Sequence, residues 1–430
     1  MKPSRTLGVV LAGLAILATL PYLRTVTLPL ISDDYTQIWL GRHYAPFDRW
    51  PALAGDALYR CRAVSIVLTY WTERVFGLHP LVFNISNLLV HILNTLLVFA
   101  LGVWRPIGWR LAGVAAAFFA IYEGHQEAVV WYAALPESTV FFFSLAAFLL
   151  WVLWIERRSH AYLAGSFAAF LLALLSKEPG VAVVGLALLP VWTERVALRR
   201  WVLPWLGFAA TALIYTALVF SGKQDHLHFH DGTFTPGPHF LLVLANSFAR
   251  MFWIWGWLSL VALAVWRERG RLRLVVLALA WAVITFLPYS FITYMSRVPS
   301  RHTYFASVAL AWIVGAALLA LWDRAGSRRA WAVGSVAGIL LLHNCGWVWT
   351  RKYAQFSERA RPTEELIQFV QSVKGPVYVH CFPNSVLVAV WAADMRLGRE
   401  VVPVASLDQA RGPVFCSPKH HAPAVVASGK

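Results

Sequence analysis

Two adjacent carboxylates, Asp33 and Asp34, follow directly after the first hydrophobic segment of a chain that has only 21 acidic residues among 430. A carboxylate close to low-dielectric surroundings holds a proton more tightly than one in water, so it is a better base for proton abstraction. The pair is therefore a candidate for a general base or for a group that orients an attacking hydroxyl. The alternative is structural: Ser32 caps a short helix, and both acids complement the positive end of its dipole.

Further charged residues stand at the ends of later hydrophobic segments. His125 and Glu127 belong to a polar loop, which either is simply solvated or lines the same outer cavity as the acid pair. Lys177 and Glu178 stand directly before a proline, and Arg301 stands at the start of another hydrophobic run. A lysine or an arginine at such a place either anchors a helix at lipid headgroups or binds a phosphate group.

Three histidines, His226, His228 and His230, alternate with other residues in the segment 225–231. This set makes a site for a divalent metal ion possible, but a loop with the histidines on one side of an extended strand is the favoured interpretation. The four cysteines show no metal-ligand spacing. The sequence therefore indicates no certain cofactor.

A polar set in the second hydrophobic segment recurs at a spacing of three and four residues, so its members share one face of a helix. The set consists of Asn84, Asn87, His91 and Asn94. Hydrogen bonds between neighbouring helices explain such a face without any catalytic role.

The composition is typical of an integral membrane protein. The chain is 59% hydrophobic and 13% charged, and its mean hydropathy is +0.60. A chain of this composition has more apolar surface than one soluble core could bury. Apolar runs of about 17 to 25 residues recur along most of the length, as helices that cross a bilayer require. The 37 Lys and Arg residues lie mostly in short loops between these runs, so we expect contact with the membrane and not with nucleic acid.

The hydrophobic pattern predicts a mainly α, polytopic membrane protein with about eleven transmembrane helices. The first is expected to be an uncleaved helix within residues 1–24. The others are expected at residues 81–103, 111–122, 138–155, 161–175, 180–192, 202–220, 240–265, 274–292, 305–322 and 331–349. The loop 25–80 carries the acid pair, and its residues 63–76 predict an amphipathic helix in the membrane interface.

Alternate loops differ in their arginine content, which indicates the orientation in the membrane. The loops that we assign to the cytoplasm contain Arg105, Arg110, Arg157, Arg158, Arg195, Arg199, Arg200, Arg267, Arg269, Arg271, Arg273, Arg324, Arg328 and Arg329. The opposite short loops contain only isolated cations. We therefore expect Asp33 and Asp34 to face the periplasm or exterior, most simply from a bacterial inner membrane.

The composition changes after Trp349, which divides the chain into a transmembrane domain, residues 1–350, and a small C-terminal region, residues 351–430. Residues 363–373 predict an amphipathic helix, and residues 376–382 predict a strand. With an odd number of spans, this α/β region lies outside the cytoplasm. Cys381 and Cys416 are expected to pair if that compartment is oxidising.

Six stretches, in this order, resemble the membrane-embedded glycosyltransferases of the GT-C superfamily, and in particular the membrane part of the protein O-mannosyltransferase and tetratricopeptide-associated mannosyltransferase group. They are Ser32-Asp33-Asp34-Tyr35; Tyr59-Arg60-Cys61-Arg62 with Phe76-Gly77-Leu78-His79-Pro80; residues 84–94; His125-Gln126-Glu127 with Trp131; Ser176-Lys177-Glu178; and Arg301-His302-Thr303-Tyr304. The family's usual Tyr-Arg-Pro reads Tyr-Arg-Cys here, its Glu-Arg-Tyr reads Ser-Arg-His, and no tetratricopeptide repeats are visible.

The resemblance implies a GT-C fold and the transfer of a sugar from a polyprenyl-phosphate donor to a protein, lipid or glycan acceptor. It implies that the catalytic carboxylate is Asp33 or Asp34, and we favour Asp33. The same stretches contain the candidates for contact with the substrate or its phosphate, which are Arg60, His125, Glu127, Lys177, Glu178, Arg301 and Tyr304.

The chemistry of such a transfer fits these residue types. A lipid phosphate leaves as a stabilised anion and needs no strong acid, so one carboxylate base and one cationic phosphate clamp suffice, and in-line displacement inverts the anomeric centre. A transporter or flippase of a lipid-linked saccharide would need polar or broken helices at the membrane midplane. The polar residues here gather at the outer ends of the spans, which favours an enzyme, while an inactive scaffold remains a third alternative.

Overall fold

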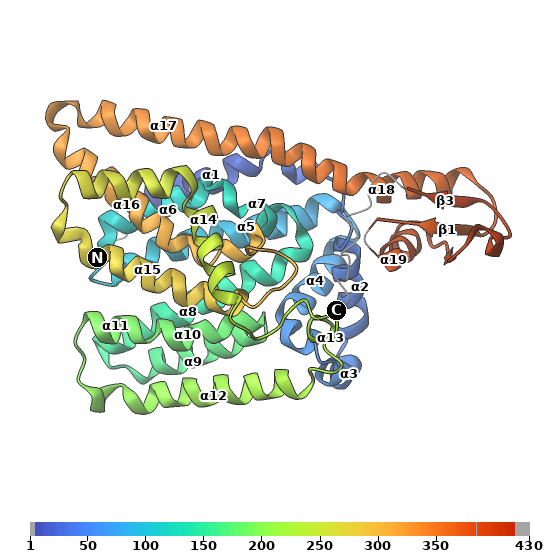
Figure 1. Cartoon of the computed structure of the whole chain (residues 1–430), viewed down its shortest axis with the longest axis horizontal. Helices are drawn as coiled ribbons and strands as arrows, with labels where there is room; N and C mark the ends of the chain where they lie inside the picture. The colour runs from blue at the N-terminus through green and yellow to red at the C-terminus, as the bar shows by residue number, and fades with distance from the viewer. Residues whose placement is uncertain (1–4, 384, 418–430) are drawn as a thin grey trace.

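The computed structural model describes residues 5–383 and 385–417, which form an elongated helical bundle with a small region of helices and strands at one end (Figure 1). All eleven predicted apolar segments contain helices. The helices of the bundle are α1 (Arg5–Thr19), α5 (Pro80–Ala100), α6 (Gly108–Ile121), α8 (Leu135–Arg157), α9 (His160–Leu174), α10 (Ala182–Leu186), α11 (Leu188–Thr193), α12 (Val202–Ser221), α14 (Phe240–Val265, kinked at Trp253), α15 (Leu272–Phe286), α16 (Ser307–Arg324) and α17 (Arg329–Trp347).

Eight helical segments of the described chain are long and apolar enough to cross a membrane. Three shorter apolar segments, Gly108–Ile121, His160–Leu174 and Glu178–Thr193, complete the predicted set. The expectation of a polytopic helical membrane protein is therefore confirmed, and eight of the about eleven predicted spans meet the length that a bilayer requires.

The predicted outer loop, residues 25–80, folds into short helices at the end of the bundle. They are α2 (Asp34–Tyr44), α3 (Trp50–Gly55) and α4 (Ala63–Phe76), and the short helix α13 (Leu227–His230) lies at the same end (Figure 1). A fifth short helix, α7 (Gln126–Val130), follows α6. Helix α4 has the predicted bounds and exposes Trp71 and Phe76, which suits its predicted place in the membrane interface.

Helix α16 lies at the centre of the bundle, where residues 307–317 are all buried. Small residues allow it to approach α6 closely: a Cβ atom at Gly315 would lie 3.3 Å from the backbone nitrogen of Ala115. Such contacts replace the hydrophobic effect as the force between helices in lipid. In contrast, α12 lies at the periphery, and its Leu203 and Leu213 are exposed.

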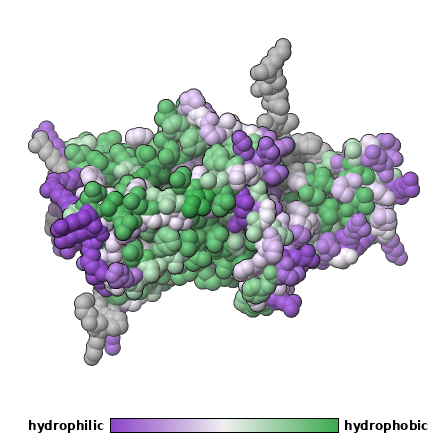
Figure 2. Space-filling model, turned by 90° about the horizontal axis from the view of Figure 1, so that it is seen from below, coloured by the Kyte–Doolittle hydropathy of each residue, from purple (hydrophilic) through white to green (hydrophobic). Residues whose placement is uncertain are grey.

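The surface of the molecule has a broad apolar belt along the bundle, bounded by hydrophilic residues at both ends (Figure 2). The belt covers the helices that Figure 1 shows running side by side along the long axis. Leucine and tryptophan side chains supply much of it, among them the exposed Leu206, Leu218 and Trp257. An apolar band between two polar ends is what a bilayer core between two headgroup layers requires.

Ion pairs join the arginine-rich loops at one end of the bundle. Arg110 and Arg271 bind the carboxylate of Asp323 at 2.7 and 3.4 Å, and Arg324 binds Glu268 at 3.1 Å. These loops are far apart in the sequence, so their contacts gather the predicted cytoplasmic charges at one end, opposite the acid pair. The alternation that the arginine pattern predicts is therefore present in the fold.

The polar face of α5 binds loop backbone and neighbouring helices at the other end. The amide of Asn84 donates to the carbonyl oxygens of Val26 and Leu28 at 3.0 and 2.9 Å, and that of Asn87 donates to Ala128 and Val129 at 3.0 and 2.9 Å. Asn94 likewise donates to the carbonyl oxygen of Ser138 at 2.9 Å. The prediction that this face serves interhelical hydrogen bonding is confirmed.

The last span continues without a break into the C-terminal region. Helix α17 passes through a π-helical segment, Val348–Lys352, into α18 (Tyr353–Ser372), so the predicted polar segment 351–361 is helical and the predicted helix 363–373 is only the end of α18. A parallel sheet follows in the order β2-β1-β3, with β1 (Val377–Cys381), α19 (Val386–Leu397), β2 (Val401–Pro403) and β3 (Val414–Cys416). Cys381 and Cys416 form a disulfide, which confirms their predicted pairing.

The disulfide suits an oxidising compartment, and it leads to a prediction about sidedness. In a variant without the two buried free cysteines, Cys61 and Cys345, Ser372→Cys should react with a membrane-impermeant maleimide in cells with a permeabilised outer membrane. Ser327→Cys at the opposite end is the matched control and should react only after lysis. Protection of position 372 until lysis would reverse the topology.

Candidate active site

The acid pair lies at the start of α2, and the turn before the helix places the two carboxylates in different surroundings. Ser32 has a φ of 42°, in the left-handed region that residues with a Cβ rarely adopt. Asp34 is buried, and its two carboxylate oxygens accept the backbone N–H groups of Ile31 and Ala133, each at 2.7 Å. Asp34 therefore ties the start of α2 to the loop that precedes α8.

Asp33 is half-buried, and its carboxylate is not used to cap the helix. The N-cap residue of α2 is Asp33 and not Ser32, so the predicted Ser32 cap is wrong, while both acids lie at the N-terminal end of the helix, as the structural alternative expects. Burial raises the pKa of Asp33, while the guanidinium groups of Arg359 and Arg301 oppose the shift. Burial also raises the pKa of Asp34, to about 7, against the effect of its two backbone hydrogen bonds.

Two arginines share one aromatic ring beside the acid pair. The guanidinium carbons of Arg301 and Arg359 lie 5.1 and 4.3 Å from the ring centroid of Trp131. Glu127 accepts the backbone N–H of Arg301 at 3.2 Å, and its carboxylate lies 3.6 Å from the Arg301 guanidinium. We call these four residues the arginine–tryptophan cluster. Trp131 stands two residues before Ala133, whose backbone N–H binds Asp34. The cluster therefore lies next to the acids.

A second group of charges surrounds Glu137, at the start of α8. Its carboxylate is paired with the Lys177 ammonium, accepts the hydroxyl of Tyr289 at 2.6 Å and lies 3.1 Å from Nε2 of His302. The side chains of Glu137 and Lys177 are 2% and 14% exposed, and burial lowers the pKa of His302 to about 4. In this Glu137 network, the charge of Lys177 is thus matched within the protein.

The two arginines of Tyr59-Arg60-Cys61-Arg62 have different environments. Arg60 donates to the carbonyl oxygen of Leu218 at 2.5 Å and so holds the end of α12. Nε of Arg62 is buried without a hydrogen-bond partner among the described residues. The carboxylate of Glu178 lies 3.9 Å from Nε2 of His226. Arg60 is thus tied to α12 through one of its nitrogens, whereas Nε of Arg62 makes no hydrogen bond within the described residues.

His125 and Tyr304 lie in the core of the bundle, away from any open surface. Nε2 of His125 lies 2.7 Å from Oγ of Ser307, and the Tyr304 hydroxyl lies 2.8 Å from Nδ1 of His91. The rings of His125 and Tyr304 pack on each other with centroids 4.5 Å apart. Their contacts support the bundle, so the structure does not bring these two predicted residues to the acid pair.

The histidine segment is the short helix α13 and not the predicted extended strand, because the backbone N–H groups of Phe229 and His230 bind the carbonyl oxygen of His226. Helical geometry separates the side chains: His226 is buried, His228 binds Thr233 at 3.1 Å and His230 is exposed. In the described part of the chain, no group of three or more His, Cys, Asp or Glu residues could hold a metal ion.

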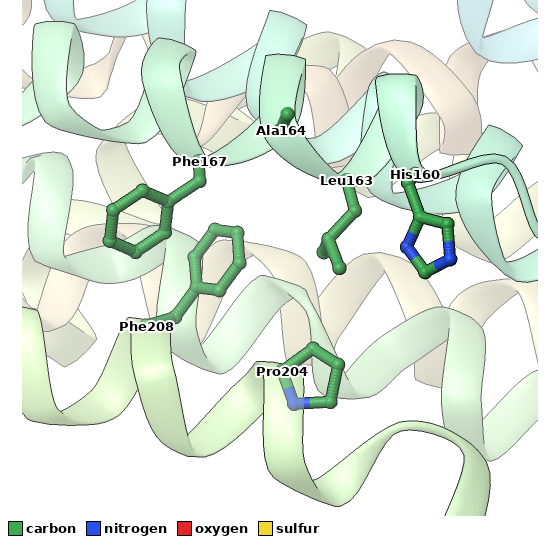
Figure 3. A pocket seen from close by; sticks show the side chains of 6 residues that line it. All are labelled: His160, Leu163, Ala164, Phe167, Pro204 and Phe208. Atoms are coloured by element: carbon green, nitrogen blue, oxygen red, sulfur yellow. The ribbon is translucent and has the colours of Figure 1, made fainter.

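Two cavities lie away from the acid pair. One, of about 400 Å³, is between α9 and α12, where Phe167 and Phe208 pack edge to face with centroids 5.4 Å apart (Figure 3). The other, of about 420 Å³, is at the arginine-rich end and is lined in part by Arg195 and Arg273. The first is lined mainly by apolar side chains, which suits contact with lipid tails and adds nothing to the candidate site.

Three charged residues of this end were not predicted as site residues. Glu137 could have been recognised, because an acid within an apolar segment is costly and often functional. Arg62 belongs to the same motif as Arg60, Tyr59-Arg60-Cys61-Arg62, and only the contacts in the structure distinguish the two arginines. Arg359 has no local pattern that marks it, since it reaches Trp131 from a helix more than two hundred positions later.

The fold is shared with solved proteins of low sequence identity. Among the solved structures that share it, ArnT from Cupriavidus metallidurans bound to undecaprenyl phosphate is 17% identical, with a TM-score of 0.52, and its apo state is 15% identical, with a TM-score of 0.57. Both matches cover 94% of this chain and 87% of the other. The Archaeoglobus fulgidus oligosaccharyltransferase tethered with an acceptor peptide is 12% identical, with a TM-score of 0.50, over 94% of this chain and 64% of the other. No protein-family model and no curated protein matches the sequence.

Proposed function

We propose that this protein transfers a sugar from a polyprenyl-phosphate donor to an acceptor hydroxyl at the extracytoplasmic face of a bacterial inner membrane, with inversion. The observation that carries this proposal is the half-buried carboxylate of Asp33, which is uncommitted to a helix cap and lies among cations at the polar end of a GT-C bundle. Two solved proteins that share this fold are described with undecaprenyl phosphate and with an acceptor peptide, respectively.

In the proposed reaction, Asp33 accepts the proton of the acceptor hydroxyl while the hydroxyl oxygen attacks the anomeric carbon. The bond from that carbon to the phosphate oxygen breaks, and the lipid phosphate leaves as an anion. Asp34 fixes the start of α2, and with it Asp33, because its two carboxylate oxygens accept the backbone N–H groups of Ile31 and Ala133. The rate gain asked of the base is about 100-fold or more.

The departing phosphate needs cations on the side of the sugar opposite the base. Arg301 adjoins His302 of the Glu137 network in the sequence, and it packs on Trp131 beside the acid pair. Arg62 offers an unpartnered Nε, and Lys177 lies in the same part of the outer end. We therefore propose that Arg301, Lys177 and Arg62 stabilise the donor phosphate, with Glu127 and Glu178 holding this group of cations in place.

Arg301→Lys tests the phosphate clamp. Lysine keeps the charge but loses the planar fork that binds phosphate with two hydrogen bonds, so transfer at limiting donor should fall about tenfold or more, as expected for the loss of charged hydrogen bonds. Arg351→Lys, at an exposed position outside the site, is the matched control. Wild-type turnover of Arg301→Lys at limiting donor would remove Arg301 from the site.

The pH dependence of transfer follows from the base. Asp33 must be ionised to accept a proton, and its pKa is raised above the ordinary value of 3.8. The rate should therefore fall as the pH is lowered through a range above 3.8, and the midpoint should shift upward in Arg359→Gln, which removes a cation that opposes the rise. An acid limb that stays unchanged in this variant would contradict the assignment.

The direct test is a panel of polyprenyl-phosphate sugars, offered to the purified protein in detergent, with cleavage of the sugar from the lipid as the readout. We expect the wild type to cleave at least one donor. Because the sequence resembles mannosyltransferases, the mannosyl donor is the first candidate. Movement of a lipid-linked saccharide across liposomes without any cleavage would favour a flippase instead.

A further inference from the structure

Arg359 is brought to the acid pair by the C-terminal region. It lies in the first half of α18, beyond the last span, and packs on Trp131 at 4.3 Å together with Arg301. A guanidinium over an indole gains a cation–π contact, but this contact uses the face of the group and leaves its N–H donors free.

The charges of the arginine–tryptophan cluster are not balanced. Glu127 is paired with Arg301, whereas Arg359 has no ion pair within 4.0 Å and donates no hydrogen bond within residues 5–383 and 385–417. Arg359 is nevertheless half-buried. A partly desolvated cation that makes no direct ion pair gains stability when an anion binds it, so the free N–H groups of Arg359 suit an anionic ligand.

The position of Arg359 relative to Asp33 indicates which substrate supplies that anion. In an inverting displacement, the base and the leaving phosphate stand on opposite sides of the sugar, so a cation that acts on the base lies on the acceptor side. Arg359 packs on Trp131, which stands two residues before the Ala133 whose N–H binds Asp34, whereas Lys177 is paired with Glu137. Arg359 is thus placed beside the acid pair, in a different group of contacts from Lys177.

We propose that Arg359, held on the face of Trp131, binds a phosphate or carboxylate group of the acceptor, so that the acceptor of this protein is an anionic molecule with a hydroxyl close to its charge. This inference rests on the proposed function for the assignment of Asp33 as base. Free phosphate esters and phospholipid headgroups share the required chemistry.

The C-terminal region holds Arg359 in this position through contacts with α2. Trp391 of α19 stacks on Trp39 of α2 with centroids 4.8 Å apart, and Arg396 donates to the Tyr35 hydroxyl at 3.4 Å. One hydrophobic cluster includes Tyr35 and Ile38 from α2 together with buried residues of α18 and α19. The region is therefore built onto the catalytic loop, so substrate binding by one of its side chains needs no domain movement.

The test measures the reactivity of individual arginines toward phenylglyoxal in the full-length protein in detergent, by peptide mass spectrometry, with exposed Arg351 as the internal reference. Inorganic phosphate at about ten times its Kd should slow modification of Arg359 about tenfold, because modification then requires the free fraction of sites. Undecaprenyl phosphate should protect Arg62 and leave Arg359 reactive. Phosphatidylglycerol replaces inorganic phosphate in a third arm, to test a lipid headgroup as the source of the anion.

Each outcome has a distinct meaning. Protection of Arg359 by inorganic phosphate or by phosphatidylglycerol supports the proposal and tells a soluble from a lipid acceptor. Protection of Arg359 by undecaprenyl phosphate would make it a donor ligand and overturn the proposal, as would the absence of protection by both other anions. If undecaprenyl phosphate protects neither Arg62 nor Arg301, the donor assignment fails instead, while the result for Arg359 stands by itself.

Discussion

Replacement of Asp33 with Asn should slow sugar transfer about 100-fold or more at saturating donor, because the amide cannot accept the proton of the attacking hydroxyl. Expression and donor binding should change little, since the Asp33 carboxylate caps no helix and forms no ion pair within 4.0 Å in the described chain. The measurement is the initial rate of transfer with the donor that the panel identifies, alongside binding of undecaprenyl phosphate.

Asp34→Asn is the matched control for this prediction. Its carboxylate accepts two buried backbone N–H groups, and an amide keeps only one acceptor oxygen, so we expect a loss of stability of about 1–3 kcal/mol and a smaller loss of rate. Near-normal transfer rates from both variants would rule out a catalytic acid pair. A collapse confined to Asp34→Asn would exchange the roles of the two acids.

The second large effect is expected at Glu137, where Gln should destabilise the protein by about 3–5 kcal/mol, because Lys177 is then left charged and buried without its partner. Thermal unfolding in detergent measures this. The matched control is Glu73→Gln, which breaks the more exposed pair with Arg42 and should cost about 1 kcal/mol or less.

A double variant separates the loss of the ion pair from a general effect on packing. Glu137→Gln with Lys177→Met removes both charges, and it should recover much of the stability that Glu137→Gln loses. If Glu137→Gln alone unfolds at the wild-type temperature, the charge of Lys177 does not depend on Glu137, and the prediction is wrong.

Much of the bundle could be predicted from the sequence because its signals are local. Apolar length identifies the helices, arginine content identifies the loops that meet at one end, and the spacing from Asn84 to Asn94 identifies a face that binds neighbouring backbone. The acid pair could be found in the same way, since two carboxylates after a hydrophobic segment stand out by composition.

The partners of the candidate site could not be predicted, because they are set by contacts between distant segments. Nothing in the residues around Lys177 shows that Glu137 neutralises it, and nothing around Arg359 shows that Trp131 lies beneath it. The predictions for His125 and Tyr304 illustrate the same limit, since their residue types suit a site while their packing places them in the core.

The uninterrupted passage from α17 through the π-helical segment into α18 connects the lipid phase to the acid pair. Trp349 at the junction donates to the carbonyl oxygen of Leu20 at 3.1 Å, and Arg24 donates to that of Trp349 at 2.9 Å, so the first and last spans tilt together. A helix adjusts its tilt when the hydrocarbon thickness changes, and Arg359 lies between the π-helical segment and Pro362, within the α-helical part of α18. One continuous helical segment therefore links the bilayer to the guanidinium beside Asp33, and we expect the proposed transfer rate to differ between membranes of different lipid chain length.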